Sequence, residues 1–169
     1  MQEFMYKMCD DGSYAVMSYN GDEENVIIPS VYGEAPITVL FDKLFMGHKE
    51  IKSIKIPDTV TDIGEFAFEG CENLHHVYLP EELENIWPYA FCRSSIEEIT
   101  IPHKIISIAP CTFMDCKELK RIDLPAGLKK IRAWAFGGCI SLTEINHEPG
   151  VQFDPQTFMR NELKGNLTD

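Results

Sequence analysis

Residues 56–80 read IPDTVTDIGEFAFEGCENLHHVYLP, and residues 101–125 repeat the same framework as IPHKIISIAPCTFMDCKELKRIDLP. Both stretches begin with Ile-Pro, end with Leu-Pro, and carry a phenylalanine and a cysteine at matching positions. Self-similarity at a fixed period is the signature of proteins built from stacked repeats. The repeat therefore decides the fold.

The register extends well beyond these two copies. Phenylalanine recurs every 22 or 23 residues, at Phe45, Phe68, Phe91, Phe113, Phe136 and Phe158. Aliphatic residues keep the same step in five further columns, one of which is Ile54, Val77, Ile99, Ile122 and Ile145. One repeat cannot bury its own apolar edge, so each copy gains stability from its neighbours. These columns predict a β-rich solenoid in which each copy is one coil.

Each coil is expected to contain one short strand. Val77-Tyr78-Leu79 alternates inside, outside and inside, as a strand does, and the following Pro80 ends it because proline cannot donate to a ladder. Strands of successive coils are expected to pair in parallel, about 4.8 Å apart. The phenylalanines are expected to turn inward and stack, which would hold the outer wall to the strands.

The N-terminal residues do not follow the repeat. EFMYKMCD, at 3–10, and the segment 14–19 alternate around a turn at Asp10–Ser13, which predicts a β-hairpin. Phe4, Tyr6 and Met8 would share one face, and Tyr14, Val16 and Ser18 another. We expect one domain with a β cap at 1–27, about five repeats at 28–147, the first of them longer, and a partial repeat with a C-terminal cap at 148–169.

The segments IPDTVTDIGEFAFEGCENL and LPAGLKKIRAWAFGGCISL resemble the BspA-type (Treponema-type) leucine-rich repeat in their Ile-Pro, Ala-Phe and Cys-x-x-Leu landmarks. The resemblance implies a right-handed horseshoe, with short parallel strands on the concave side and irregular, 3-10 and short extended segments on the convex side. It also implies a binding role, often in bacterial surface proteins. Two departures stand out: Trp87-Pro88 replaces the usual glycine, and Ser94 replaces the cysteine.

Charge limits the class of partner. The chain carries 27 acidic against 15 basic residues, for a formal net charge of −12. Nucleic acids and anionic membranes both require a basic footprint, so neither is expected as a partner. No signal peptide or membrane span is evident, and free cysteines favour the cytoplasm. A secreted or cell-surface protein whose leader has been removed is the alternative. Self-repulsion favours a monomer.

Cysteine and histidine are the candidates for chemistry. Cys71, Cys116 and Cys139 share one repeat position, where they are expected to pack as small apolar groups; a Cys116–Cys139 disulfide between coils is the alternative. His75, His76, His103 and His147 lie near Glu97, Glu98 and Asp123, and on one face they would suit a metal or acid–base site. A solvated polar face is the simpler interpretation, and no catalytic motif, metal site or cofactor is predicted.

The remaining polar residues form two outward columns on the predicted strands. Solenoids commonly bind through their concave face, and tyrosine and arginine dominate interface hot spots. We therefore expect a non-enzymatic protein-interaction module that binds an unidentified protein through His76, Tyr78, Glu98, Thr100, Arg121, Asp123, Glu144 and Asn146. The alternative is an adhesive or structural fragment of a bacterial cell-surface protein. A small hydrolase or metal-dependent enzyme that uses the histidines is a remote third.

Overall fold

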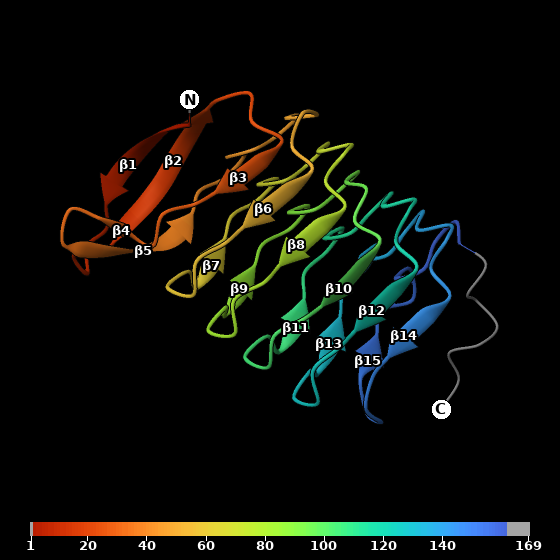
Figure 1. Cartoon of the computed structure of the whole chain (residues 1–169). Coiled ribbons are helices and arrows are strands. Elements are labelled where there is room, and N and C mark those ends of the chain that lie inside the picture. Colours follow the sequence, from red (N-terminus) through yellow and green to blue (C-terminus); the bar gives the residue numbers. More distant parts are fainter. Residues whose placement is uncertain (1, 162–169) are drawn as a thin grey trace.

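The computed structural model describes residues 2–161, and within them it contains strands and turns but no helix. Figure 1 shows successive coils stacked along one axis, from the red N-terminal end toward the blue end. The strands are β1 (Glu3–Met8), β2 (Tyr14–Asn20), β3 (Asn25–Ile27), β4 (Val31–Tyr32), β5 (Ala35–Leu40), β6 (Ser53–Lys55), β7 (Asp62–Ile63), β8 (His76–Tyr78), β9 (Asn85–Ile86), β10 (Glu98–Thr100), β11 (Ser107–Ile108), β12 (Arg121–Asp123), β13 (Lys130–Ile131), β14 (Glu144–Asn146) and β15 (Gln152–Phe153).

Three-residue strands form one wall of the solenoid, in the row β3, β6, β8, β10, β12 and β14 of Figure 1. They pair in parallel, with Val26, Ile54 and Val77 in register in the first sheet. Ile99, Ile122 and Ile145 are in register in the second sheet. The middle residue points inward and its neighbours point outward, because successive side chains of a strand alternate. The predicted parallel ladder is confirmed.

The six-residue β5 and a series of two-residue strands form a second wall, with the parallel orders β5-β7-β9 and β11-β13-β15. The second residue of β7, β9, β11 and β13 is a buried isoleucine: Ile63, Ile86, Ile108 and Ile131. These are the short extended segments that the family resemblance implies. Tandem turns, rather than 3-10 helix, connect them to the rest of each coil within residues 2–161.

Both walls are interrupted at the same coil. No ladder joins β8 to β10 or β9 to β11, although β8 and β10 still lie side by side. The Glu97 amide reaches the His75 carbonyl at 3.4 Å, whereas the Lys120 amide reaches the Glu97 carbonyl one coil later at 2.8 Å. The interruption coincides with a coil that is one residue short between Phe91 and the buried aliphatic Ile96. We call this break between β8 and β10 the seam.

The phenylalanine column forms a continuous stack. Adjacent rings from Phe45 to Phe158 lie nearly parallel, with centroids 5.0 to 5.7 Å apart. From Phe68 onward the residue before each ring is small and buried and leaves room for it: Ala67, Ala90, Thr112, Ala135 and Thr157. Offset stacking of this kind stabilises a core beyond the area buried. The inward stack expected from the sequence is confirmed.

Each of these coils also turns through the left-handed region of backbone space. The first left-handed column is Lys43, Phe66, Tyr89, Cys111 and Trp134, and the second is Gly47, Gly70, Arg93, Asp115, Gly138 and Arg160. A residue other than glycine pays roughly 1–2 kcal/mol for that conformation. Each of these non-glycine residues therefore lowers the stability of its turn, and the packing of the coils must offset that cost.

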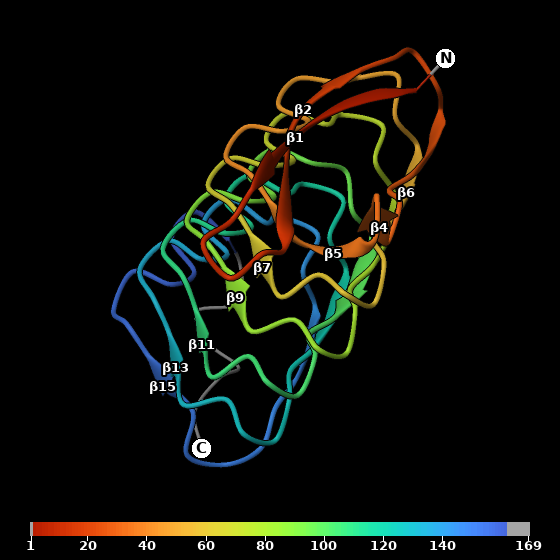
Figure 2. The same ribbon diagram turned by 90° about the vertical axis from the view of Figure 1, so that its left-hand side faces the viewer.

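The N-terminal hairpin is confirmed, but Ser18 does not take the facing position expected of it. β1 and β2 pair antiparallel, with a bulge that lets Phe4 face Tyr19 and Tyr6 face Val16. A bulge inserts one residue and reverses the alternation beyond it. As a result Tyr19, not Ser18, is buried, and its ring lies 5.2 Å from that of Phe45. Figure 2 looks onto this end of the solenoid, where the hairpin stands in front of the coils.

The hairpin does more than cover the first coil. β2 pairs in parallel with β5, so it extends the second wall by hydrogen bonds. β3 already belongs to the three-residue ladder, so pairing starts at Asn25, before the repeat region expected from residue 28. At the other end β15 continues the second wall, and the remainder of the expected C-terminal cap, residues 162–169, lies outside the described residues.

Candidate interaction surface

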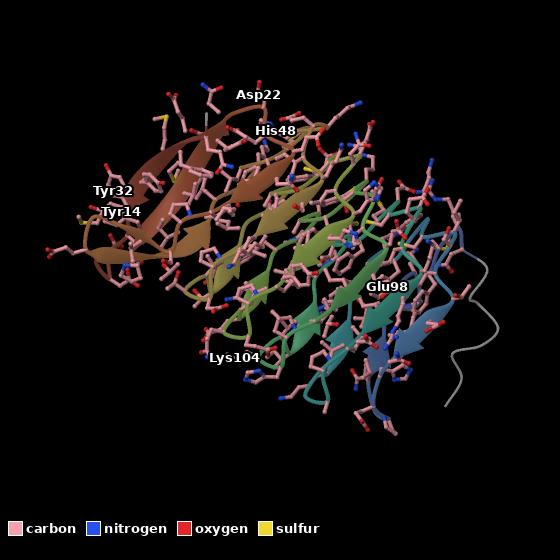
Figure 3. All side chains as sticks on the ribbon, viewed as in Figure 1. Tyr14, Asp22, Tyr32, His48, Glu98 and Lys104 are labelled. Atoms are coloured by element: carbon pink, nitrogen blue, oxygen red, sulfur yellow. The ribbon has the colours of Figure 1, made fainter. Side chains whose placement is uncertain are left out.

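The candidate site is the strand face, by which we mean the outward side chains of β3, β6, β8, β10, β12 and β14. Backbone register aligns them in two columns on each side of the seam. Before the seam the columns are Asn25, Ser53, His76 and Ile27, Lys55, Tyr78, and after it they continue as Glu98, Arg121, Glu144 and Thr100, Asp123, Asn146. All eight residues expected from the sequence lie on this face, seven of them exposed and Asp123 partly so. Figure 3 labels Glu98 among them.

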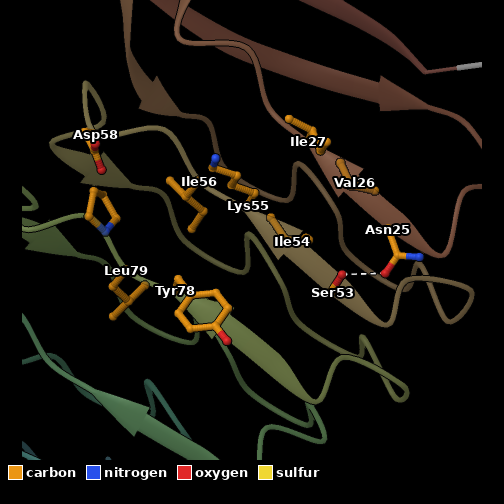
Figure 4. A pocket seen from close by; sticks show the side chains of 11 residues that line it. Asn25, Val26, Ile27, Ser53, Ile54, Lys55, Ile56, Asp58, Tyr78 and Leu79 are labelled. Atoms are coloured by element: carbon orange, nitrogen blue, oxygen red, sulfur yellow. Dashed lines mark hydrogen bonds between the residues drawn. The ribbon is translucent and has the colours of Figure 1, made fainter.

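Tyr78 is the most prominent residue of the strand face, with 77% of its surface exposed. Beside it lies a hollow of about 500 Å³ bounded by β3, β6 and β8. Figure 4 shows Tyr78 and Leu79 at one end of this hollow and Ile27 at the other, with Lys55 between them. Ile27 is 63% exposed, so the hollow combines an apolar floor with exposed apolar edges. It is the most apolar part of the strand face.

Tyr78 also borders a second hollow, of about 370 Å³, at the seam. His76, Glu98, Thr100 and Asp123 line it together with the edge of β8. The missing ladder between β8 and β10 opens the wall at this point. The two hollows therefore differ in chemistry, and a single exposed ring separates them.

Arg121 and Asp123 are engaged with each other. The Arg121 guanidinium lies 3.0 Å from the Asp123 carboxylate, and the Asn146 amide donates to the same oxygen at 2.5 Å. The Asn146 hydrogen bond and the Arg121 charge hold the pKa of Asp123 below its usual value. The same ion pair raises the pKa of Arg121. An incoming partner must therefore compete with an ion pair already in place.

The histidines are dispersed, each near a different group. His75 Nδ1 lies 3.7 Å from the Glu97 carboxylate, too far for a hydrogen bond. His103 lies 3.4 Å from Glu81, and His147 lies 2.9 Å from the Glu148 carbonyl oxygen. Across residues 2–161 no three histidine, cysteine or acidic side chains gather closely enough to hold a metal ion.

All six cysteines are free thiols, and five of them are buried. Cys71, Cys116 and Cys139 each donate a hydrogen bond to the carbonyl of the phenylalanine one coil earlier, at 3.1, 3.0 and 3.0 Å. Asn161 takes the same repeat position and donates to Phe136 in the same way. The cysteine position therefore ties one coil to the next through a hydrogen bond. Burial raises the pKa of Cys71 and Cys116 to about 12, which keeps both thiols protonated at neutral pH.

Sequence reasoning missed part of this surface. Asn25 and Ile27 line the larger hollow, but the sequence interpretation placed them in the cap. Their signal is the triplet Asn25-Val26-Ile27, which has the same outside–inside–outside pattern as later strands. It lies 28 residues before Ser53-Ile54-Lys55 rather than 22 or 23, so it falls out of step with the repeat.

Comparison with known proteins identifies the class. The model of the BspA type leucine rich repeat region matches residues 38–164 in six copies. The chain therefore belongs to the BspA-type leucine-rich repeat family, whose members are typically non-enzymatic repeat modules, and no enzymatic family is indicated. A search of curated proteins gives no significant match.

Solved structures agree with this assignment. A leucine-rich repeat protein of T. pallidum is similar at 27% identity and a TM-score of 0.76, over 89% of this chain and 82% of that one. A leucine-rich cell surface protein of Faecalibacterium prausnitzii is 22% identical with a TM-score of 0.58, over 87% and 54% of the two chains. One from Eubacterium ventriosum is 18% identical with a TM-score of 0.64, over 87% and 42%. Figure 1 thus shows a leucine-rich repeat solenoid. Within residues 2–161 no helix is long and apolar enough to cross a membrane.

Proposed function

We propose that the chain is a non-enzymatic protein-interaction module that binds its partner through the strand face. The exposed ring of Tyr78, placed between an apolar and a polar hollow, carries the proposal. Tyrosine supplies a large, rigid contact area together with a polar tip, and it is enriched among interface hot spots. Its backbone is held in a ladder on the β6 side, so little ordering is needed before binding.

The size of the strand face favours an extended partner. Six strands about 4.8 Å apart, each three residues of about 3.3 Å, give a patch on the order of 25 by 10 Å. A standard interface buries about 800 Å² on each partner, which exceeds this patch several-fold. The partner must therefore also contact the bordering loops, as the lining of the larger hollow by Asp58 and Pro80 suggests. A peptide segment or loop that runs across the strands fits this geometry.

The two hollows suggest what that segment presents. An aliphatic or aromatic side chain would remove the apolar surface of Ile27 and Leu79 from water, at about 25 cal/mol per Å². A hydrogen-bonding group beyond Tyr78 would meet His76, Glu98 and Thr100. The partner is expected to carry an apolar residue and a polar residue on either side of the Tyr78 ring.

Affinity capture from cells of the source organism tests the proposal, with the wild type, Tyr78→Ala, Arg121→Ala and the double variant as baits. Ile140→Ala is the matched control, because Ile140 is 60% exposed in a turn outside the strand face. A protein recovered by the wild type and the control should be depleted with Tyr78→Ala, and most strongly with the double variant. Equal recovery by all baits would exclude the strand face.

A role in adhesion or in the architecture of the cell surface is the second candidate. The similar structure from F. prausnitzii is that of a cell surface protein, and the present chain spans about half of it. Proteinase treatment of intact cells, followed by immunodetection, tests this second candidate. Loss of the intact chain would place it on the surface, as the candidate requires, and full protection would exclude an adhesive or structural role there.

A further inference from the structure

A second surface, away from the strand face, combines exposed aromatic side chains with uncompensated acidic groups. Trp87 and Phe41 are 48% and 42% exposed, and both line a cleft of about 330 Å³ beside the second wall. Single exposed apolar residues are normal on a protein surface, whereas two aromatic rings that line the same cleft indicate an interaction site. We call this the tryptophan cleft.

The repeat itself builds this cleft. Phe41, Gly64 and Trp87 occupy one column, and the Gly64 and Trp87 amides donate to the Leu40 and Ile63 carbonyls one coil earlier. Coils are about 4.8 Å apart, so the two aromatic residues stand roughly 10 Å apart with glycine between them. A Cβ on Gly64 would lie 2.6 Å from the Asp42 amide nitrogen. Position 64 therefore cannot carry a side chain, and the cleft stays open between the two aromatic residues.

Carboxylates surround this floor. Asp42, Asp62 and Glu65 line the tryptophan cleft, and no basic side chain does so. Asp42 accepts a hydrogen bond from the Glu65 amide, and Asp62 accepts from Thr61 and Asn85. Within residues 2–161 none of the three forms an ion pair. The tryptophan cleft thus combines exposed aromatic rings with carboxylates that carry negative charge.

The other tryptophan of the chain, Trp134, has a cationic side chain over its ring. The Arg160 guanidinium lies over Trp134 at 5.2 Å from the ring centroid, and the Trp134 indole donates to Gln156. Lys43 holds its amine over Phe66 at 6.0 Å. In the described part of the chain no cation lies over Trp87. Its ring is available for an incoming cation.

We propose that the tryptophan cleft binds an arginine side chain of a partner protein, with the guanidinium against Trp87 and its charge facing Asp62 and Glu65. Guanidinium is planar and weakly hydrated, so it stacks on an indole face and still donates to carboxylates. An ammonium group is more strongly hydrated and cannot stack in the same way. The proposal does not depend on the strand face, because Tyr78 and Trp87 line different cavities.

Acetylated tetra-arginine labelled with fluorescein is a direct probe, with tetralysine and tetracitrulline as the ammonium and uncharged comparisons. Binding is measured by fluorescence anisotropy. In a Trp134→Phe background Trp87 is the sole tryptophan, and its emission reports where the peptide binds. Tetra-arginine should bind saturably and change that emission, tetralysine should bind more weakly, and tetracitrulline should not bind.

Two variants locate the binding. Trp87→Ala should weaken it by about 2- to 30-fold without any change in charge. Asp62→Asn/Glu65→Gln should also weaken it, and more than the matched control Glu98→Gln/Glu144→Gln, which removes the same charge from the strand face. Tyr78→Ala should bind like the wild type. Unchanged affinity in Trp87→Ala, equal loss in both carboxylate pairs, or equal binding of tetralysine would overturn the proposal.

Discussion

Phe91 lies in the interior of the ring stack, and its removal measures how far the coils depend on one another. The ring is fully buried, 5.0 Å from Phe68 and 5.4 Å from Phe113, and nearly parallel to both. Phe91→Ala removes buried carbon and leaves a cavity, which costs roughly 3–5 kcal/mol. Whole domains are stable by only about 5–15 kcal/mol. One substitution should therefore remove a large share of the free energy of unfolding.

Phe91→Leu separates the stacking of the rings from the filling of space. Leucine keeps the site apolar but loses both ring contacts, each worth about 0.5–1.5 kcal/mol, so we expect a loss of roughly 1–3 kcal/mol. Phe158→Ala is the matched control, because this partly exposed ring stacks in parallel on one neighbour, Phe136, at 5.7 Å. It should cost less than Phe91→Ala.

Urea denaturation followed by circular dichroism measures the free energies of unfolding, and the m-value checks that the extent of unfolding is unchanged. A loss below about 1.5 kcal/mol for Phe91→Ala, half the low end expected for such a truncation, would refute this reasoning. Equal losses at Phe91 and Phe158 would also refute it. They would show that a ring packed between two neighbours contributes no more to the free energy of unfolding than a ring with one.

Further predictions concern buried polar groups, alkaline pH and the left-handed turns. Arg93→Ala leaves the buried Glu69 carboxylate without its guanidinium and should cost about 1–3 kcal/mol in urea denaturation, whereas Glu69→Gln/Arg93→Ala should recover part of this loss. Burial raises the pKa of Cys71 and Cys116 from 9.0 to about 12, so the stability they contribute is complete below pH 9 and is lost as pH rises toward 12. The urea midpoint should fall over that range, and less steeply in Cys71→Ala/Cys116→Ala; a parallel fall in both proteins would contradict the assignment. Gly138→Ala should lower the thermal midpoint, because φ is +75° and a Cβ there would meet the Asp115 side chain, and an unchanged midpoint would show that the turn accepts a side chain without strain.

Much of the fold could be predicted because each sequence pattern recurs in several repeats. The phenylalanine column, the parallel strands and the outward residues such as Tyr78 all follow from apolar period and strand alternation. The bulge at the N-terminal hairpin could not be predicted, because one inserted residue reverses the facing side chains without leaving a mark in composition. The expected facing position of Ser18 was wrong for this reason.

The candidate site was predicted as columns of residues but not as a shape. The sequence shows that one residue is missing between Phe91 and Ile96, but it does not show that the ladder opens between His76 and Glu98, because the hollow there depends on how backbone pairing adjusts to that loss. The aromatic Trp87 was recognised as a departure from the family pattern. That Trp87 shares a cleft with Phe41, two coils away across Gly64, becomes visible only in the structure.

The central claim is that the strand face beside Tyr78 is where a partner binds. Site-specific photo-crosslinking tests it most directly, with p-benzoylphenylalanine in place of Tyr78 and, in a separate control, in place of the exposed Ile140. After irradiation in cells of the source organism, position 78 should yield a discrete crosslinked protein that position 140 does not. No crosslink at 78, or the same crosslinked product from both positions, would contradict the account.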